Sequence, residues 1–130
     1  MYSPRVLAHF ENERFAGELQ NADVSVQVDN PACGDILRLS LKTHDGRISD
    51  ARFRARGCVA SIASASQLCE LLVGRSVAEA RALRREEIVA ALGGLPEASV
   101  HASHLAIDAL KAALRELTQQ GEFLHKQART

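Results

Sequence analysis

The sequence predicts an α+β domain in which a small three-stranded antiparallel sheet packs against several helices. Between residues 24 and 56, three short runs alternate apolar and polar residues with the period of two that is typical of half-buried strands. From residue 59 onward the apolar residues recur instead with the period of helices. The chain has 130 residues, which is one ordinary domain and too little for two full-sized ones. Strands followed by helices favour a sheet covered by helices on one face.

The first half of the chain supplies one helix and the three strands. A short N-terminal helix is expected over residues 2–11, because apolar residues recur there at helical spacing after a proline that suits a first turn. Residues 15–21 have no clear period and are expected to form a connector. The inward-facing positions of the expected strands are Val24, Val26 and Val28, then Leu37, Leu39 and Leu41, then Ala51, Phe53 and Ala55. Asp45 and Gly46 form the dipeptide of a tight hairpin turn between the last two strands.

The second half is predicted to be helical. One helix begins near Val59 and ends before Gly74, with an apolar face made by Ile62, Ala65, Cys69 and Leu72. Ser76 and Glu79 have capping-box spacing, so a helical region is expected to begin there and to run to about residue 92. This region forms either one helix or two short ones. A Gly-Gly-Leu-Pro break follows at 93–96. The last helix starts between Ser99 and Ser103 and ends at Gly121, beyond which a frayed polar tail is expected, so residues 1–130 form a single domain.

Composition excludes several classes of function. Sixteen basic residues balance sixteen acidic ones, which argues against nucleic acid or an anionic membrane as a partner. The alternating arginines at 52, 54 and 56 are interpreted as a solvated face of the third strand, because aromatic residues are only 4% of the chain. No apolar run suggests a membrane span or an export signal, so the expected location is the cytoplasm. Three cysteines without an export signal predict thiols or metal ligands rather than disulfides.

Two cysteines, Cys33 and Cys58, lie at positions where a thiol could bind a metal or react. Cys33 and Asp35 are spaced i, i+2, so on extended backbone the thiol and the carboxylate point to the same side and can converge on one ion. Cys58 follows Gly57 at the start of a helix, where free N–H groups and the helix dipole stabilise a thiolate. Burial as core filler is the alternative for each. Cys69 is predicted to be core, because eleven helical residues place it about 16 Å from Cys58.

Histidines provide further candidate ligands. His101 and His104 lie three residues apart near the start of the last helix and share a face if that helix includes both. The alternative is that they are ordinary polar residues at an exposed helix start. His9, His44 and His125 are assigned no role.

Nearly the whole chain resembles the iron-sulfur cluster assembly scaffolds of the IscU/NifU N-terminal-domain family. Two motifs make the resemblance specific, a Pro-x-Cys-Gly-Asp motif ending at Asp35 and a Gly-Cys-x-x-x-Ile-Ala-Ser motif that contains Cys58. The other matching segments are Tyr-Ser-Pro-Arg-Val-Leu at 2–7, His-Phe-Glu-Asn at 9–12, Ala-Arg-Phe at 51–53, Gly-Arg-Ser at 74–76, Leu-Pro at 95–96, His101, and Asp-Ala-Leu-Lys-Ala-Ala-Leu at 108–114. The layout is that of the IscU branch, since the long insertion of the SufU branch is missing. The family's fold agrees with the predicted α+β class.

The resemblance implies a ligand set with one departure. Family members hold a nascent cluster or zinc with three cysteines, the aspartate of Cys-Gly-Asp and a histidine directly before the third cysteine. Cys33, Asp35, Cys58 and His101 match these positions, whereas the third cysteine is replaced by Ala102. In the family that cysteine accepts persulfide sulfur from a cysteine desulfurase, and alanine can neither accept sulfur nor bind iron.

The four matching residues still form a complete donor set. Two thiolates, an imidazole and a carboxylate can bind zinc tetrahedrally or hold a transient 2Fe-2S cluster, with two ligands for each iron. His104 is an additional candidate at the rim of the site. The resemblance implies a cysteine desulfurase and iron-sulfur acceptor proteins as partners. It does not carry over the dedicated Hsp70-type chaperone, because the Leu-Pro-Pro-Val-Lys segment recognised in IscU-type members reads Leu-Pro-Glu-Ala-Ser at 95–99.

The sequence therefore favours a scaffold-like, metal-binding protein of iron-sulfur cluster assembly, without enzymatic activity of its own and with altered sulfur acceptance. One alternative is an enzyme that transfers sulfur through Cys58 with the help of His101. Another is a degenerate domain that binds assembly partners and holds no cluster.

Overall fold

The computed structural model describes residues 2–32 and 34–128, with side chains up to residue 120. One helix precedes three strands, and the remaining helices follow, as the sequence predicts. The elements are α1 (Pro4–Glu11), β1 (Val24–Asn30), β2 (Asp35–His44), β3 (Arg47–Arg56), α2 (Val59–Leu72), α3 (Val77–Arg81), α4 (Arg85–Ala91), the 3-10 turn η1 (Glu97–Ser99) and α5 (His101–Ala128).

The three strands form one antiparallel sheet in the order β1-β2-β3. The β2–β3 hairpin turns at Asp45 and Gly46, whose φ values of 51° and 76° are those of the tight turn that this dipeptide favours. Leu39 lies between Val26 and Phe53 in the register, so apolar side chains of all three strands face the same side. The three strands and the turn at Asp45 and Gly46 were thus predicted correctly from the sequence.

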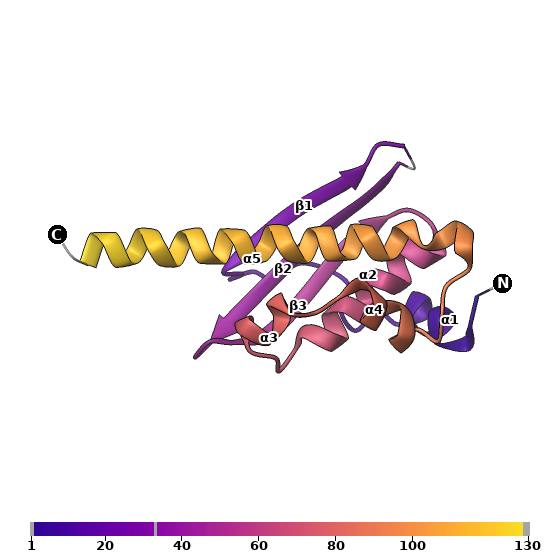
Figure 1. The fold of residues 1–130 in the computed structure, drawn as a ribbon, viewed down its shortest axis with the longest axis horizontal. Coiled ribbons are helices and arrows are strands. Elements are labelled where there is room, and N and C mark those ends of the chain that lie inside the picture. The colour runs from indigo at the N-terminus through magenta and orange to yellow at the C-terminus, as the bar shows by residue number, and fades with distance from the viewer. Residues whose placement is uncertain (1, 33, 129–130) are drawn as a thin grey trace.

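One face of the sheet is covered by α2 and α5 (Figure 1). Helix α5 crosses the strands and contacts β1 and β2, whereas α2 contacts β3 and α5. The core between these layers contains fully buried leucines at 37, 39 and 41. On the other face, Arg54 and Arg56 are exposed as expected, while Arg52 is half-buried and forms an ion pair with Asp50.

Helix α2 is more deeply buried than its sequence pattern indicates. Its apolar face was expected to carry Ile62, but Ile62 is only half-buried, while Ser61, Ser64 and Gln67 are buried. The reason is tertiary: α1, α4, α5 and β3 all pack around this helix. The serines and small residues of α2 allow these neighbours to approach from several sides.

Helix α1 begins at Pro4, because the Ser3 hydroxyl accepts a hydrogen bond from the Val6 N–H and caps the first turn. His9 fastens α1 to α2. Its Nδ1 lies 2.9 Å from Ser66 Oγ, and its Nε2 lies 3.0 Å from Glu70 Oε2. His9, to which the sequence assigned no role, therefore holds two helices together.

The helical region after Ser76 divides into α3 and α4, and the capping box of Ser76 and Glu79 is present. The last helix begins at His101, within the predicted window. The predicted end at Gly121 is wrong, because α5 continues to Ala128. Glycine costs a helix only about 1 kcal/mol relative to alanine, which is too little to stop a long helix by itself. Within the described residues, none of the helices combines the length and the apolar character needed to span a membrane.

Candidate metal centre

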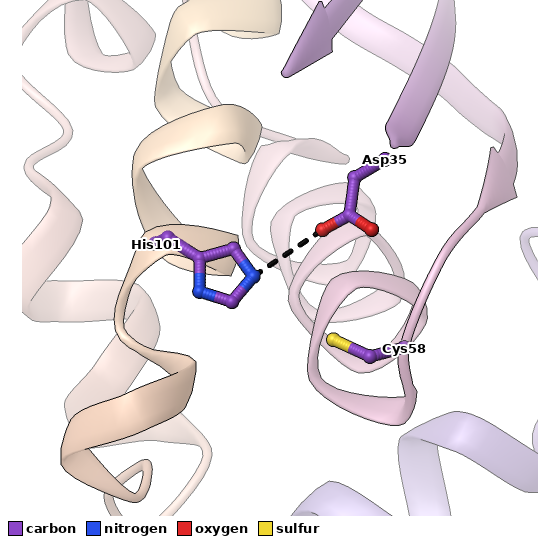
Figure 2. Close-up of side chains that lie close together, drawn as sticks. All are labelled: Asp35, Cys58 and His101. Carbon is purple, nitrogen blue, oxygen red and sulfur yellow. Dashed lines mark ion pairs between the residues drawn. The ribbon is translucent and has the colours of Figure 1, made fainter. Parts of the chain in front are cut away.

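Three of the four predicted ligands meet at one point in the structure (Figure 2). One ligand atom each of Asp35, Cys58 and His101 lies within 4.8 Å of the other two. The Cys58 sulfur points toward the carboxylate and the imidazole. The fourth predicted ligand, Cys33, lies outside the described residues.

Each of these residues stands at the start of an element. Asp35 is the first residue of β2, where it pairs with Asn30 of β1. Cys58 is the N-cap of α2, one position before the first turn in which the sequence placed it. His101 is the first residue of α5 and follows the 3-10 turn η1. The site therefore forms where the ends of the sheet and of two helices converge.

The Asp35 carboxylate is buried and held from two sides. The side chain is 5% exposed, and its Oδ2 accepts a hydrogen bond of 2.6 Å from the Ser61 hydroxyl. The same oxygen lies 3.3 Å from His101 Nε2. Its Oδ1 lies against Gly57, so closely that a Cβ at that position would be 2.5 Å away. A residue with a side chain at position 57 would clash with the Asp35 carboxylate, so this position requires glycine.

Cys58 is an exposed thiol beside these groups. Its sulfur lies 3.3 Å from Ser61 Oγ. As the N-cap residue, Cys58 lies at the start of α2 and makes no side-chain capping hydrogen bond to the helix.

Ser61 is a site residue that sequence reasoning missed. The periodicity of the helix places Ser61 away from the predicted apolar face. The signal available was its spacing of three residues after Cys58, which brings two side chains together on the first turn of a helix. Its contact with Asp35 follows only from the packing of α2 against the start of β2.

The other candidates lie elsewhere. Cys69 is fully buried on α2, as predicted, and burial raises the pKa of its thiol far above the usual range. His104 is exposed and does not belong to the group of ligand atoms that the described residues form. Ala102 is 1% exposed, directly after His101.

The donor set fits a metal ion or an iron-sulfur cluster. Sulfur, nitrogen and carboxylate oxygen all bind zinc at about 2.0–2.3 Å, which puts tetrahedral ligand atoms about 3.3–3.8 Å apart. The observed limit of 4.8 Å requires only a small inward movement of side chains. The mixture of one soft sulfur with nitrogen and oxygen suits zinc or iron better than calcium or magnesium.

Comparison with known proteins identifies the family and the fold of this chain. The model of the NifU-like N-terminal domain matches residues 1–122. The chain belongs to this family. The iron-sulfur cluster assembly scaffold protein IscU of Escherichia coli (strain K12) is 42% identical to this NifU-like domain over 125 residues, which cover 93% of this chain and 97% of that protein. The scaffold protein IscU 1 of Archaeoglobus fulgidus is also 42% identical, over 114 residues that cover 88% of this chain and 74% of the relative.

Solved structures agree with the NifU-like fold. A NifU-like protein (N-terminal) from Brucella abortus superimposes with a TM-score of 0.72 at 22% identity, covering 90% of this chain and 94% of that one. A putative scaffold protein for the SUF system from Fervidobacterium islandicum gives a TM-score of 0.71 at 23% identity, covering 87% of this chain and 96% of the other. The expected three-stranded IscU/NifU-like architecture is therefore confirmed.

Proposed function

We propose that this protein is a scaffold for iron-sulfur cluster assembly that holds iron, a transient 2Fe-2S cluster or zinc with Cys33, Asp35, Cys58 and His101. The observation that carries the proposal is the meeting of three donor atoms within 4.8 Å on a chain that is 42% identical to scaffold proteins. The metal or cluster is cargo, and the protein itself carries out no turnover.

The chain's own residues have distinct tasks in this scheme. Asp35 supplies a buried carboxyl group, and the exposed Cys58 offers a sulfur ligand that a partner can reach. His101 supplies nitrogen at the position next to Ala102, where the family pattern has a cysteine. Ala102 provides no ligand where a three-cysteine scaffold has a soft sulfur atom, so this chain should bind a cluster more weakly than such a scaffold does.

The proposed partners are a cysteine desulfurase that supplies sulfur and proteins that accept the finished cluster. With Ala102 unable to take up sulfur, Cys33 and Cys58 are the thiols left to receive it at the site. A cytoplasmic location, which keeps thiols reduced, suits these free thiol ligands.

The test is anaerobic reconstitution with iron, cysteine and a desulfurase, followed by visible absorption. The natural protein, Ala102→Cys and Cys58→Ala are compared. Sulfide-to-iron bands in the natural protein that disappear in Cys58→Ala would support a working scaffold. Bands only in Ala102→Cys would show that the rest of the site is intact but that the natural protein does not build clusters. Binding of zinc or of partner proteins would then be its function.

Two further outcomes would contradict the proposal. A natural protein that binds neither cluster, iron nor zinc would favour a domain that only binds partners. An iron-independent sulfur transfer that alkylation of Cys58 abolishes would favour an enzyme.

A further inference from the structure

The hydroxyl of Ser61 joins two of the predicted ligands. We propose that Ser61 is a positioning residue, which holds the Asp35 carboxylate in the orientation that binds the metal cargo. The inference rests on the proposed function in that it takes the cargo to be a metal ion or cluster. It goes further because it assigns part of the metal affinity to Ser61, which is not itself a ligand.

The position of Ser61 follows from the start of α2. Cys58 is the N-cap, and Ser61 is the third residue of the helix, so the two side chains lie one above the other. The Ser61 hydroxyl oxygen lies 3.3 Å from the Cys58 sulfur and 2.6 Å from Asp35 Oδ2. One side chain thus bridges β2 and α2 at the point where their ligands meet.

The protons of this chain of contacts can be assigned. The carboxylate of Asp35 can only accept, so the single hydroxyl proton of Ser61 is donated to Oδ2. The hydroxyl then has none left for sulfur, and Cys58 is the donor when it is a thiol.

Burial makes this hydrogen bond important for the carboxylate. Ser61 and Asp35 are 5% and 3% exposed, so water is a poor substitute for the hydroxyl group. Hydroxyl-to-carboxylate hydrogen bonds of 2.5–2.7 Å are among the stronger ones in proteins. If the Ser61 hydroxyl is removed, Asp35 Oδ2 keeps its contact with His101 among the described residues. His101 is itself a predicted ligand.

Hydrogen bonds to ligating carboxylates stabilise bound metal. Losing such a partner typically lowers metal affinity about 10- to 100-fold. A carboxylate oxygen has two lone pairs, so Asp35 Oδ2 can accept from Ser61 and bind an ion at the same time. We therefore expect Ser61→Ala to weaken metal binding about 10- to 100-fold.

The experiment is titration of the purified chain with cobalt(II), followed by absorption, with zinc affinity obtained by competition. Four proteins form a cycle: the natural chain, Ser61→Ala, Asp35→Ala and the double variant. Ser64→Ala is the matched control, because Ser64 is also buried on the same helix and its hydroxyl has no hydrogen-bond partner among the described residues. Circular dichroism confirms that each variant is folded.

A positioning role predicts that Ser61→Ala weakens binding in the natural background and has no further effect when Asp35 is alanine. The thiolate-to-cobalt band should persist at saturation, because Cys58 is unchanged. Equal affinities of the natural chain, Ser61→Ala and Ser64→Ala would overturn the inference, and so would an equal loss with and without Asp35. A natural chain that binds neither cobalt nor zinc and forms no cluster on reconstitution with iron would instead refute the proposed function.

Discussion

Asp35 has a different neighbour at each of its carboxylate oxygens. Oδ2 faces Ser61 and His101, which are polar, whereas Oδ1 faces the backbone at Gly57. The two sides together leave the side chain little room to turn. Gly57, which has no side chain, therefore leaves the space that a predicted ligand more than twenty positions earlier in the chain occupies.

Gly57→Ala is expected to destabilise the protein and to weaken its metal binding. The added methyl would lie 2.5 Å from Asp35 Oδ1, and the buried carboxylate has to move. Overpacking of this kind costs about 1–3 kcal/mol of unfolding free energy, measurable by urea denaturation. If Asp35→Ala in the same chain fails to recover part of this loss, the clash with the carboxylate is not its cause.

The two described cysteines are expected to differ strongly in reactivity. Cys58 is exposed, whereas Cys69 is fully buried and burial raises the pKa of its thiol. In a Cys33→Ser variant, iodoacetamide should modify Cys58 under native conditions and Cys69 only after unfolding. Mass spectrometry of peptides measures both sites, and rapid native labelling of Cys69 would contradict the structure.

The sequence predicted three residues that the structure brings together, but not the residue that contacts two of them. Asp35, Cys58 and His101 were predicted from motif spacing and family resemblance, because ligand chemistry restricts which residues can stand there. Ser61 was missed, since its importance depends on α2 packing against the start of β2. Local periodicity carries no information about that long-range contact.

At the level of elements, α1 depends on a polar contact for its place on α2. His9→Ala should lower the free energy of unfolding by about 1–3 kcal/mol, because the buried Ser66 hydroxyl loses its partner. His44→Ala is the control, since the His44 side chain is 80% exposed and its change should stay within about 0.5 kcal/mol. Equal effects of the two variants in urea denaturation would show that α1 is held by apolar packing alone.

Elements whose signals are local were predicted well. The alternation of leucines in β2, the Asp45-Gly46 turn and the Ser76 capping box each act within a few residues. The surroundings of α2 and the end of α5 were not predicted. Burial of α2 depends on four neighbouring elements, and the continuation of α5 past Gly121 shows that one unfavourable residue does not decide a helix end.

At the level of the whole molecule, α5 closes the core over the sheet. Leu110 is 2% exposed on α5, so Leu110→Ala is expected to lower the free energy of unfolding by about 2–5 kcal/mol. Leu7→Ala makes the same change on α1, where the side chain is 44% exposed, and should cost much less. Similar denaturation midpoints for the two variants would contradict the burial that the structure assigns to α5.

The three predicted ligands that meet at the site come from β2, α2 and α5, which are far apart along the chain. An unfolded chain scatters them, so an ion at this site is expected to bind the native state more tightly than the unfolded one. At a concentration of 100 times its dissociation constant, such an ion adds about 2.7 kcal/mol to stability by mass action. A protein that holds such an ion would then resist proteolysis better than the empty protein, and its half-life in the presence of a protease would report whether the ion is bound.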